Sequence, residues 1–403
     1  MTRLLLVLLL LTGCATQPPR SSGERDFLFV WAGAAAKEQS DFLAVIDLDP
    51  ASPTFAEIFA TAPADGPRGG AHHTEHVMPK DGILLANAFG SGRTFLFDLR
   101  QPRQPRLSSS FAGAGEYMHP HSFVRLPNGN FLATYQERGH GNERPGALVE
   151  LSPNGQVLKT SDAADPAVEP FIRPYSLAVV PALDRVVTSS ADMHAKAISR
   201  AVQVWRLSDL SLIKTVVLPA PPAGKQNEDP AEPRVLSDGR TVVVSTFTCG
   251  LFLLRDLEGE SPFAEFIHKF SDTDACALPV VAGRYWVQTD ASVPGLVSLD
   301  MTDPSRPREV DRLVLASDEH PHWISLAPDG RRIVISGGAK ALQTRVLLAR
   351  IDPGTGQLTL DSSFKPKGAS QPGVSFDRAG WPHGKVGRAI PHGAVFSRRG
   401  QRN

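Results

Sequence analysis

His121–Tyr135 reads HSFVRLPNGNFLATY, two short apolar runs rich in β-branched and aromatic residues on either side of Pro-Asn-Gly-Asn. Such runs, separated by a glycine-centred turn, are typical of a β-hairpin. The same form recurs along the chain: a polar or histidine-containing start, an apolar run, a turn and a second apolar run. The clearer copies are EPRVLSDGRTVVVSTF (232–247), CALPVVAGRYWVQTD (276–290) and HWISLAPDGRRIVISG (322–337), and looser copies start at His76 and Tyr175.

The hairpins recur with a regular period. Each is followed by a further strand, such as TFLFDL, VQVWRL or GLVSLD. A unit of about four strands repeated at a spacing of 40 to 55 residues is typical of a β-propeller blade. A pair of β-sandwiches is the alternative, but it does not explain the regular spacing. The turn positions lie 44 to 55 residues apart, at Gly82, Gly129, Asp184, Gly239, Gly283 and Gly330.

The repeat accounts for six blades, and strands outside it supply a seventh. These strands are DFLAVIDLDP (Asp41–Pro50) and RAIPHGAVF (Arg388–Phe396). We therefore expect an all-β, seven-bladed β-propeller whose N- and C-terminal strands close the ring, as a single domain over residues 26–403. A helical pattern is confined to a short segment near Ala191–Val202.

The N-terminus has the pattern of a lipoprotein leader. One basic residue and a leucine run precede Leu11-Thr12-Gly13-Cys14, which matches a lipobox. We expect a signal peptide over residues 1–13, lipidation of Cys14 and a polar tether over residues 14–25. The residue after Cys14 is Ala15 and not an aspartate, which favours sorting of the lipoprotein to the outer membrane of a host with two membranes. The protein is then an exported, membrane-anchored lipoprotein facing the periplasm or cell exterior; an ordinary cleaved signal peptide or a membrane anchor is the alternative.

Charge and cysteine content restrict the partners. Lys+Arg and Asp+Glu balance at 42 each, so there is no basic footprint for nucleic acid, and we expect membrane contact through the lipid anchor only. Beyond Cys14 the chain has only Cys249 and Cys276. An oxidising compartment would allow a disulfide worth about 3 kcal/mol between them. Two buried reduced thiols are the alternative.

Histidines recur where the inner strands of the expected blades begin. His121 and His322 each lie eight residues before their turn glycine, which places both on one ring of the channel mouth. His72 and His73 arrive at the same mouth just before the first hairpin, and His392 lies in the closing strand. One such histidine is often only a satisfied channel residue, but four or more from separate blades favour a metal site.

The segment His72–His76 (HHTEH) also matches H-x-x-E-H, the inverted zinc-protease motif. That motif requires a helix, so that its two histidines share a face. Gly69 and Gly70 precede the segment and Pro79 follows it, which leaves no room for a stable helix. The protease interpretation is therefore discarded, and His76 remains a weaker metal candidate. The chain also contains no G-x-S-x-G elbow, Walker loop or paired-cysteine zinc framework.

Imidazoles without cysteine or a carboxylate set suit copper, zinc, iron or nickel. Three or four neutral imidazoles on a rigid β scaffold, with one position left open, favour Cu(II) in an exported protein. Copper is therefore the expected cofactor.

Taken together, the motifs resemble the selenium-binding protein family, which includes the methanethiol oxidases. The resemblance implies a seven-bladed propeller that binds copper through histidines. In the oxidases of the family it implies conversion of methanethiol, O2 and water into formaldehyde, hydrogen sulfide and hydrogen peroxide. The stretches that carry the resemblance follow one another over most of the chain and include DFLAVIDLDPASPTFAEIF, AHHTEH, PHSFVRLPNGNFLATY, PYSLAVVPALDRVVTSS, ISLAPDGRRIVIS and GRAIPHGAVF.

The resemblance also implies a ligand set. The family's adjacent histidine pair corresponds to His72 and His73, its next histidine to His121 and its C-terminal one to His392. His322 is supported by its register alone. Relatives commonly carry cysteines shortly after the pair, whereas residues 74–82 contain none, which argues against selenium binding.

The leading hypothesis is therefore a copper-dependent oxidase of small thiols, with a small thiol and O2 as partners and no catalytic residue assigned beyond the metal site. The first alternative is a non-catalytic propeller lipoprotein that holds a metal or presents its mouth to a partner protein. The second is a purely structural propeller, which would hold no stoichiometric metal.

Overall fold

The computed structural model describes residues 26–398 except residues 140, 142–143, 195–196 and 386. The expected signal peptide, Cys14 and the tether lie outside the described residues. Within the part of the chain that is described, no helix combines the length and the apolar character needed to cross a bilayer.

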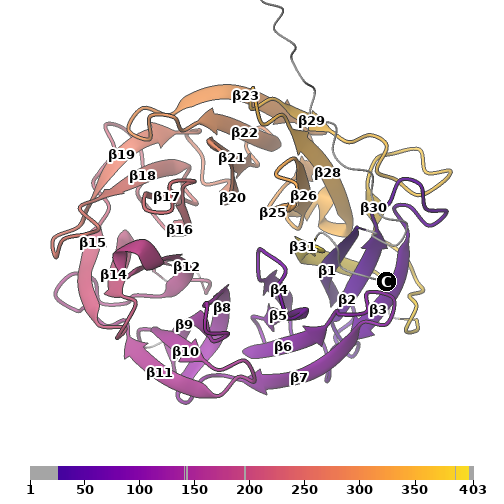
Figure 1. The fold of residues 1–403 in the computed structure, drawn as a ribbon, viewed down its shortest axis with the longest axis horizontal. Helices are drawn as coiled ribbons and strands as arrows, with labels where there is room; N and C mark the ends of the chain where they lie inside the picture. Colours follow the sequence, from indigo (N-terminus) through magenta and orange to yellow (C-terminus); the bar gives the residue numbers. More distant parts are fainter. Residues whose placement is uncertain (1–25, 140, 142–143, 195–196, 386, 399–403) are drawn as a thin grey trace, which may run out of the picture.

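The described residues form seven antiparallel sheets of four or five strands, arranged as blades around a central channel (Figure 1). The all-β, seven-bladed propeller predicted from the sequence is confirmed. From the channel outward, blade 1 contains β4 (Ala71–Thr74), β5 (Ile83–Ala88), β6 (Arg93–Asp98) and β7 (Arg106–Ala112). Blade 2 contains β8 (Tyr117–Arg125), β9 (Phe131–Arg138), β10 (Ala147–Leu151) and β11 (Val157–Asp162). Blade 3 contains β12 (Pro174–Val180), β13 (Arg185–Ser190), β14 (Ala201–Arg206) and β15 (Leu212–Val217).

The next three blades follow the same order. Blade 4 contains β16 (Pro230–Val235), β17 (Val242–Thr246), β18 (Gly250–Arg255) and β19 (Phe263–Lys269). Blade 5 contains β20 (Cys276–Ala282), β21 (Tyr285–Asp290), β22 (Gly295–Asp300) and β23 (Arg308–Val314). Blade 6 contains β25 (Trp323–Leu326), β26 (Arg332–Ser336), β28 (Arg345–Ile351) and β29 (Leu358–Leu360). Smaller elements are β30 (Val374–Ser375), which pairs with β28, the two-stranded sheet of β24 (Glu319–His320) and β27 (Ala339–Lys340), and the 3-10 turns η1 (Pro181–Leu183) and η2 (Ala341–Thr344).

Blade 7 joins the two ends of the chain. Its inner strand is β31 (Ala389–Phe396), followed outward by β1 (Phe27–Ala34), β2 (Phe42–Asp47) and β3 (Ile58–Pro63). Beyond the β1–β31 ladder, the amide of Phe27 donates to Ser397 Oγ at 2.9 Å, and the amide of Ser397 donates to the Phe27 carbonyl at 2.8 Å. The ring is thus closed by antiparallel pairing of the N- and C-terminal strands, as the sequence predicted.

The six turns that defined the repeat share one backbone conformation. The five glycines have φ between 61° and 90°, and Asp184 has φ 56°. Glycine adopts this left-handed conformation without steric cost, and aspartate is among the residues that tolerate it. The spacing read from the sequence therefore reflects a repeated left-handed hairpin turn.

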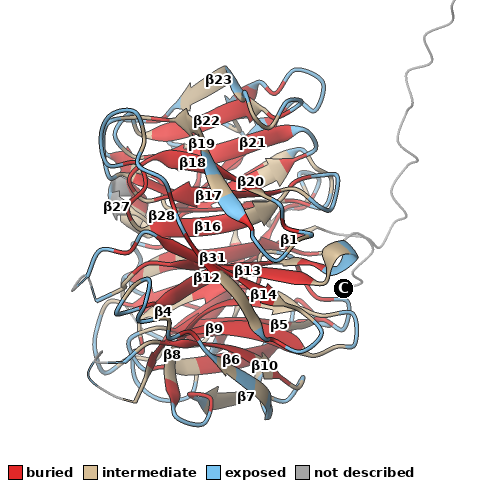
Figure 2. Cartoon of the chain, turned by 90° about the vertical axis from the view of Figure 1, so that its left-hand side faces the viewer, coloured by how far each residue is buried: buried red, intermediate tan, exposed pale blue. Residues whose placement is uncertain are grey.

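Burial follows the position of each strand in its blade (Figure 2). β1 and β2 are buried at every residue, whereas the outer strand β7 is largely exposed. The middle strands β1 and β2 are largely apolar on both faces because a neighbouring blade packs on each. Between blades 7 and 1, for example, the ring of Trp31 lies 5.4 Å from that of Phe95 and 5.3 Å from that of Phe97. The core is therefore a series of apolar layers between adjacent blades.

The short helical segment predicted near Ala191–Val202 is wrong. The described residues of this segment form turns and irregular chain, and β14 begins at Ala201. Only Ala201 and Val202 of this segment belong to β14, where pairing with β13 and β15 overrides the local preference.

Cys249 and Cys276 form a disulfide. Cys249 lies directly before β18 of blade 4, and Cys276 begins β20 of blade 5. The bond therefore ties two adjacent blades across a sequence separation of 27 residues.

We expect a Cys249→Ser/Cys276→Ser variant to lose about 3 kcal/mol of unfolding free energy, because the unfolded chain regains the entropy that this loop removes. Urea denaturation of both proteins measures the change. A reductant should lower the stability of the wild type by a similar amount and leave the double variant unaffected; equal sensitivity of the two proteins would contradict the prediction.

Candidate metal centre

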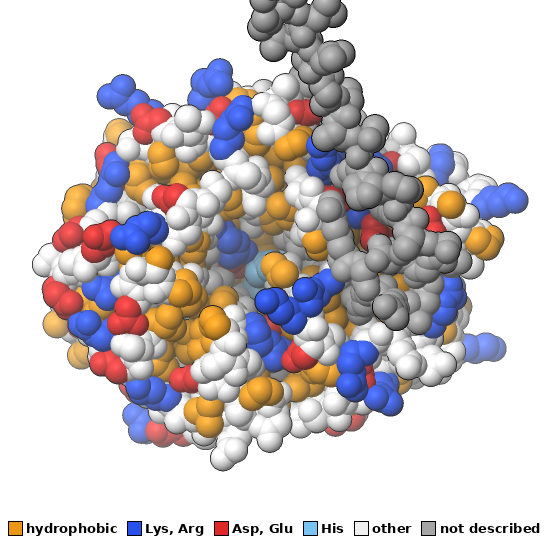
Figure 3. Space-filling view, in the orientation of Figure 1, with side chains coloured by type: hydrophobic (Ala, Val, Ile, Leu, Met, Phe, Trp, Pro, Cys, Tyr) orange, Lys and Arg blue, Asp and Glu red, His pale blue; other side chains and the backbone are white. Residues whose placement is uncertain are grey.

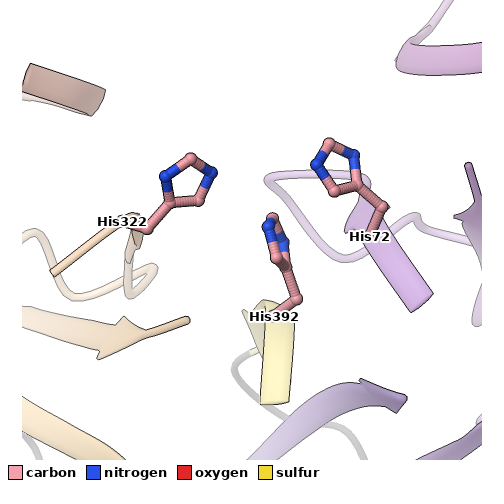
Figure 4. Close-up of side chains that lie close together, drawn as sticks. All are labelled: His72, His322 and His392. Atoms are coloured by element: carbon pink, nitrogen blue, oxygen red, sulfur yellow. The ribbon is translucent and has the colours of Figure 1, made fainter. Parts of the chain in front are cut away.

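Five histidines meet at one mouth of the channel. Their ligand-capable nitrogens form two groups in which all atoms lie within 4.8 Å of one another: His72 with His73 and His121, and His72 with His322 and His392. His72 belongs to both groups, which we call the two imidazole triads. Figure 4 shows His72, His322 and His392 projecting toward a common point from separate elements.

The triads draw on four blades. His72 and His73 lie in β4, His121 lies in β8, and His392 lies in β31. His322 directly precedes β25. The equal offset of His121 and His322 from their turn glycines does bring both residues to the same mouth. His322, which was a candidate from its register alone, forms a triad with His72 and His392.

The five rings are packed against one another. The ring centroids of His72 and His73 are 4.3 Å apart with planes 5° from parallel. The same centroid distance, 4.3 Å, separates His72 from His392 and His73 from His121, and His322 lies 4.9 Å from His392. The imidazoles thus form a continuous cluster.

Each of the four leading candidates keeps one buried ring nitrogen without a hydrogen-bond partner among the described residues. These nitrogens are Nδ1 of His72 and His392 and Nε2 of His73 and His121. A buried polar atom left without a partner costs about 1–3 kcal/mol, so such atoms usually indicate a missing water, ion or ligand. Four such nitrogens at one channel mouth indicate a missing ion or ligand; three belong to the triad of His72, His73 and His121, and the fourth, on His392, shares a triad with His72 and His322.

The other nitrogens of two of these rings are held by hydrogen bonds. His121 Nδ1 lies 2.7 Å from the carbonyl oxygen of Tyr175. Because that carbonyl can only accept, Nδ1 carries the proton, and the lone pair is on Nε2. His73 Nδ1 lies 3.2 Å from Ser122 Oγ, a hydroxyl that can donate or accept, so this contact engages Nδ1 and leaves Nε2 without a partner among the described residues. Metal-binding histidines are commonly oriented by such contacts.

Burial sets the charge of the cluster. It lowers the pKa of His72, His73 and His392 well below the ordinary value of 6.5, and neighbouring imidazoles lower it further. Burial also lowers the pKa of His121 to about 3 and that of His322 to about 4. All five rings are therefore neutral at pH 7, the state in which imidazole binds metals.

Close backbone packing holds the inner strands in place. The amide of His73 donates to Asn87 Oδ1 at 2.7 Å, and the side-chain amide of Asn87 donates to the carbonyl of Pro120 in β8. On the other side, a Cβ at Gly393 would lie only 2.6 Å from the amide nitrogen of Thr74, so β31 can approach β4 this closely only with glycine there. These contacts fix β4 between its neighbours.

Aromatic side chains surround the imidazoles. The ring of Tyr175 lies 3.8 Å from that of His121, and the ring of Trp323 lies 4.8 Å from that of His73. Phe89 lies 6.0 Å from His121 on another side. The hydroxyl of Tyr175 is buried and has no partner among the described residues. The sequence analysis did not select Tyr175, although its place at the start of a repeat copy was the available signal.

The remaining residues of the HHTEH segment have other partners. Glu75 accepts hydrogen bonds from Arg125 at 3.2 and 3.1 Å. His76 stacks on Trp323 at 4.5 Å, and its Nε2 lies 3.2 Å from Arg234 Nη2. His76, a weaker candidate from the sequence, therefore joins neither triad. Its neighbourhood opens into a cavity of about 720 Å³ that also involves Glu75 and Arg125. Figure 3 shows a histidine and basic side chains around the central hollow of one face.

Sequence comparison identifies two enzymes. The chain is 24% identical over 348 residues to a methanethiol oxidase of Hyphomicrobium sp, which covers 77% of this chain and 75% of the relative. It is 28% identical over 151 residues to a methanethiol oxidase of Ruegeria pomeroyi, which covers 35% of this chain and 34% of the relative. The expected family resemblance is confirmed. Both relatives of the methanethiol oxidase type are oxidoreductases by name, which supports the expectation of an enzyme.

Structural comparison agrees on the fold. A hypothetical selenium-binding protein from Sulfolobus tokodaii has a TM-score of 0.71 at 14% identity and covers 93% of this chain and 94% of its own. The periplasmic gluconolactonase of Pseudomonas aeruginosa has a TM-score of 0.64 at 13% identity and covers 92% and 99%. At such identities these similarities show the propeller fold alone. No protein-family model matches the chain.

We expect His121→Ala to lose most of its bound copper, because the substitution removes a neutral donor whose Nε2 faces the other imidazoles. His76→Ala is the matched control and should keep its copper, because His76 Nε2 is engaged with Arg234. Elemental analysis after copper loading and desalting gives the metal per chain. Equal copper in the two variants would reject this ligand assignment.

Proposed function

We propose that this protein is a copper-dependent oxidase of small thiols, of the methanethiol oxidase type. The observation that carries the proposal is the set of four buried imidazole nitrogens that lack partners at one channel mouth. The sequence relatives named methanethiol oxidase support the same reaction class.

The donor set suits copper. The triads contain neutral imidazoles only, with no thiolate or carboxylate among their members. Imidazole donors suit copper, nickel, iron and zinc, and copper binds most tightly in the divalent series. His72, His73, His121 and His392 would hold the ion, and His322 would lie within reach through its contact with His392.

The proposed reaction converts methanethiol, O2 and water into formaldehyde, hydrogen sulfide and hydrogen peroxide. The carbon–sulfur bond breaks, and the methyl carbon is oxidised by two electrons and receives the oxygen of water. O2 is reduced by the same two electrons to peroxide. Copper, when bound, would supply the redox-active centre for this electron transfer.

The protein's own residues fit a small, apolar thiol. Phe89, Tyr175 and Trp323 line the imidazole cluster, and aromatic rings contact sulfur and methyl groups favourably. The pKa of Tyr175 is raised well above 10 by burial and by the charge of Glu232. Tyr175 therefore stays a phenol and can donate a hydrogen bond to an oxygen or sulfur atom at the site.

We also propose export and anchoring through a lipid on Cys14, which would place the protein in the periplasm or on the cell exterior. The lipobox supports the anchor, and the disulfide between Cys249 and Cys276 is the kind of bond that persists in an oxidising compartment. Palmitate labelling of the full chain tests this: label should appear in the wild type and be absent from Cys14→Ser.

The function is tested by adding methanethiol and O2 to copper-loaded full-length protein. We expect about one copper per chain and formation of formaldehyde, sulfide and peroxide in equal amounts, with His268→Ala on the outer strand β19 behaving as the wild type. Copper without any product would replace the proposal with a non-catalytic metal-binding propeller. Absence of stoichiometric copper would leave only a structural propeller.

We expect Tyr175→Phe to keep its copper but to turn over methanethiol roughly tenfold more slowly, because it loses one hydrogen-bond donor. Tyr135→Phe is the matched control, since Tyr135 is also fully buried but bonds weakly to the Gly113 carbonyl at 3.4 Å. Steady-state peroxide release measures both variants. Equal rates in the two would show that the Tyr175 hydroxyl has no part in turnover.

A further inference from the structure

A second cluster of metal-ligand side chains lies beside the triads. Ligand atoms of His119, Glu137 and His194 all lie within 4.8 Å of one another. His119 is in β8, Glu137 is in the adjacent strand β9, and His194 is in the loop that follows β13. Neither the expected ligand set nor the proposed reaction uses any of the three.

Both ring nitrogens of His119 face acceptors. Nδ1 lies 2.7 Å from the carbonyl oxygen of Phe89, so it carries a proton. Nε2 lies 3.2 Å from Glu137 Oε1. A neutral imidazole has one N–H only, so Nε2 presents its lone pair to the carboxylate, an arrangement that a cation bound between the two atoms would satisfy. In a tetrahedral zinc site with bonds of about 2.0–2.1 Å, two ligand atoms are about 3.3 Å apart, which matches the separation found.

Glu137 supplies a separate indication of a missing ligand. The residue is 2% exposed, and its second carboxylate oxygen, Oε2, is buried without a hydrogen-bond partner among the described residues. A buried carboxylate oxygen is costly unless it is paired with a charge or a metal. A contact between His119 and Oε1 does not satisfy Oε2, whereas a metal ion can bind either or both oxygens.

The backbone also holds His119 in an uncommon state. Its φ is +58°, in the left-handed region that non-glycine residues rarely adopt. Strain of this kind is retained mainly where the side chain has a function. The Phe89 carbonyl fixes the ring so that Nε2 lies against Glu137, and His194, which is exposed, approaches from the solvent side with its ring 5.4 Å from that of His119.

We propose that His119, Glu137 and His194 form a second metal site, specific for a divalent cation of the zinc type. Two imidazoles and one carboxylate leave a fourth tetrahedral position open to water. Phe89 separates this site from the triads: its ring lies 5.1 Å from His119 and 5.6 Å from His194 on one side, and 5.9 Å from His72 on the other. The mouth of the channel therefore holds two neighbouring metal centres. This inference does not depend on thiol oxidation.

The test is the zinc stoichiometry of the metal-free full-length chain, measured by calorimetric titration with Zn²⁺ and by elemental analysis after desalting. We expect Glu137→Gln and His194→Ala each to bind one zinc fewer per chain than the wild type. His121→Ala, which alters the triads, should retain the zinc at the second site. Because His194 is exposed, its replacement leaves the core unchanged even if Glu137→Gln proves unstable.

Two controls match the substituted residues. Glu116→Gln changes a half-exposed carboxylate that pairs with Arg138, and His268→Ala changes a histidine on the outer strand β19. Both should bind as much zinc as the wild type. Zinc binding by His194→Ala equal to that of the wild type would overturn the proposal and identify His119 and Glu137 as an ordinary ion pair.

Discussion

Antiparallel pairing of β31 with β1 is the contact on which the rest of the molecule depends. It converts an open row of blades into a ring and gives blade 7 an inner strand taken from the far end of the chain. Without it, His392 would not lie beside His72, which is 320 positions earlier in the sequence. Gly393 then allows β31 to approach β4 closely enough for the two imidazole rings to lie 4.3 Å apart. Ring closure and the geometry of the histidine cluster are therefore one structural event.

The fold was readable from the sequence because one backbone requirement is repeated. Blades 1 to 6 each have a left-handed residue at the inner hairpin, and this requirement places glycine, or Asp184, at a regular spacing. The period could be counted without any knowledge of the packing. The helix predicted near Ala191–Val202 is wrong because the prediction used local helix preference alone. Most of the segment is turn and loop, and its last two residues belong to β14, which is held by partner strands on both sides. A prediction from the local sequence pattern fails where contacts with neighbouring strands decide the conformation of a segment.

The histidines were predictable to the extent that they follow the repeat. His121 and His322 share an offset from their turn glycines, and this offset does correspond to one height in the channel. The second cluster does not follow the repeat in this way. His119 lies in β8 but does not share the offset of His121, Glu137 lies in the neighbouring strand β9, and His194 lies in the loop after β13. Nothing in their spacing relates them; only the left-handed backbone at His119 and the pairing of β8 with β9 bring them together.

The HHTEH segment shows how context changes the meaning of a motif. On a helix its glutamate and outer histidines would face one another. In β4 and the loop after it, His72 and His73 stack at the channel mouth, while Glu75 turns to Arg125 and His76 to Trp323 and Arg234. The same five residues thus divide between two environments, a cluster of neutral rings and a set of charge-paired side chains.

The position of β31 also fixes an order of events during biosynthesis. β31 follows β1 to β30 in the chain, so a growing chain contains His72, His73 and His121 before it contains His392. Until then the blade that begins with β1 lacks its inner neighbour, and the imidazoles have no rigid frame. A chain that lacks β31 therefore cannot present the complete set of imidazole donors at the channel mouth.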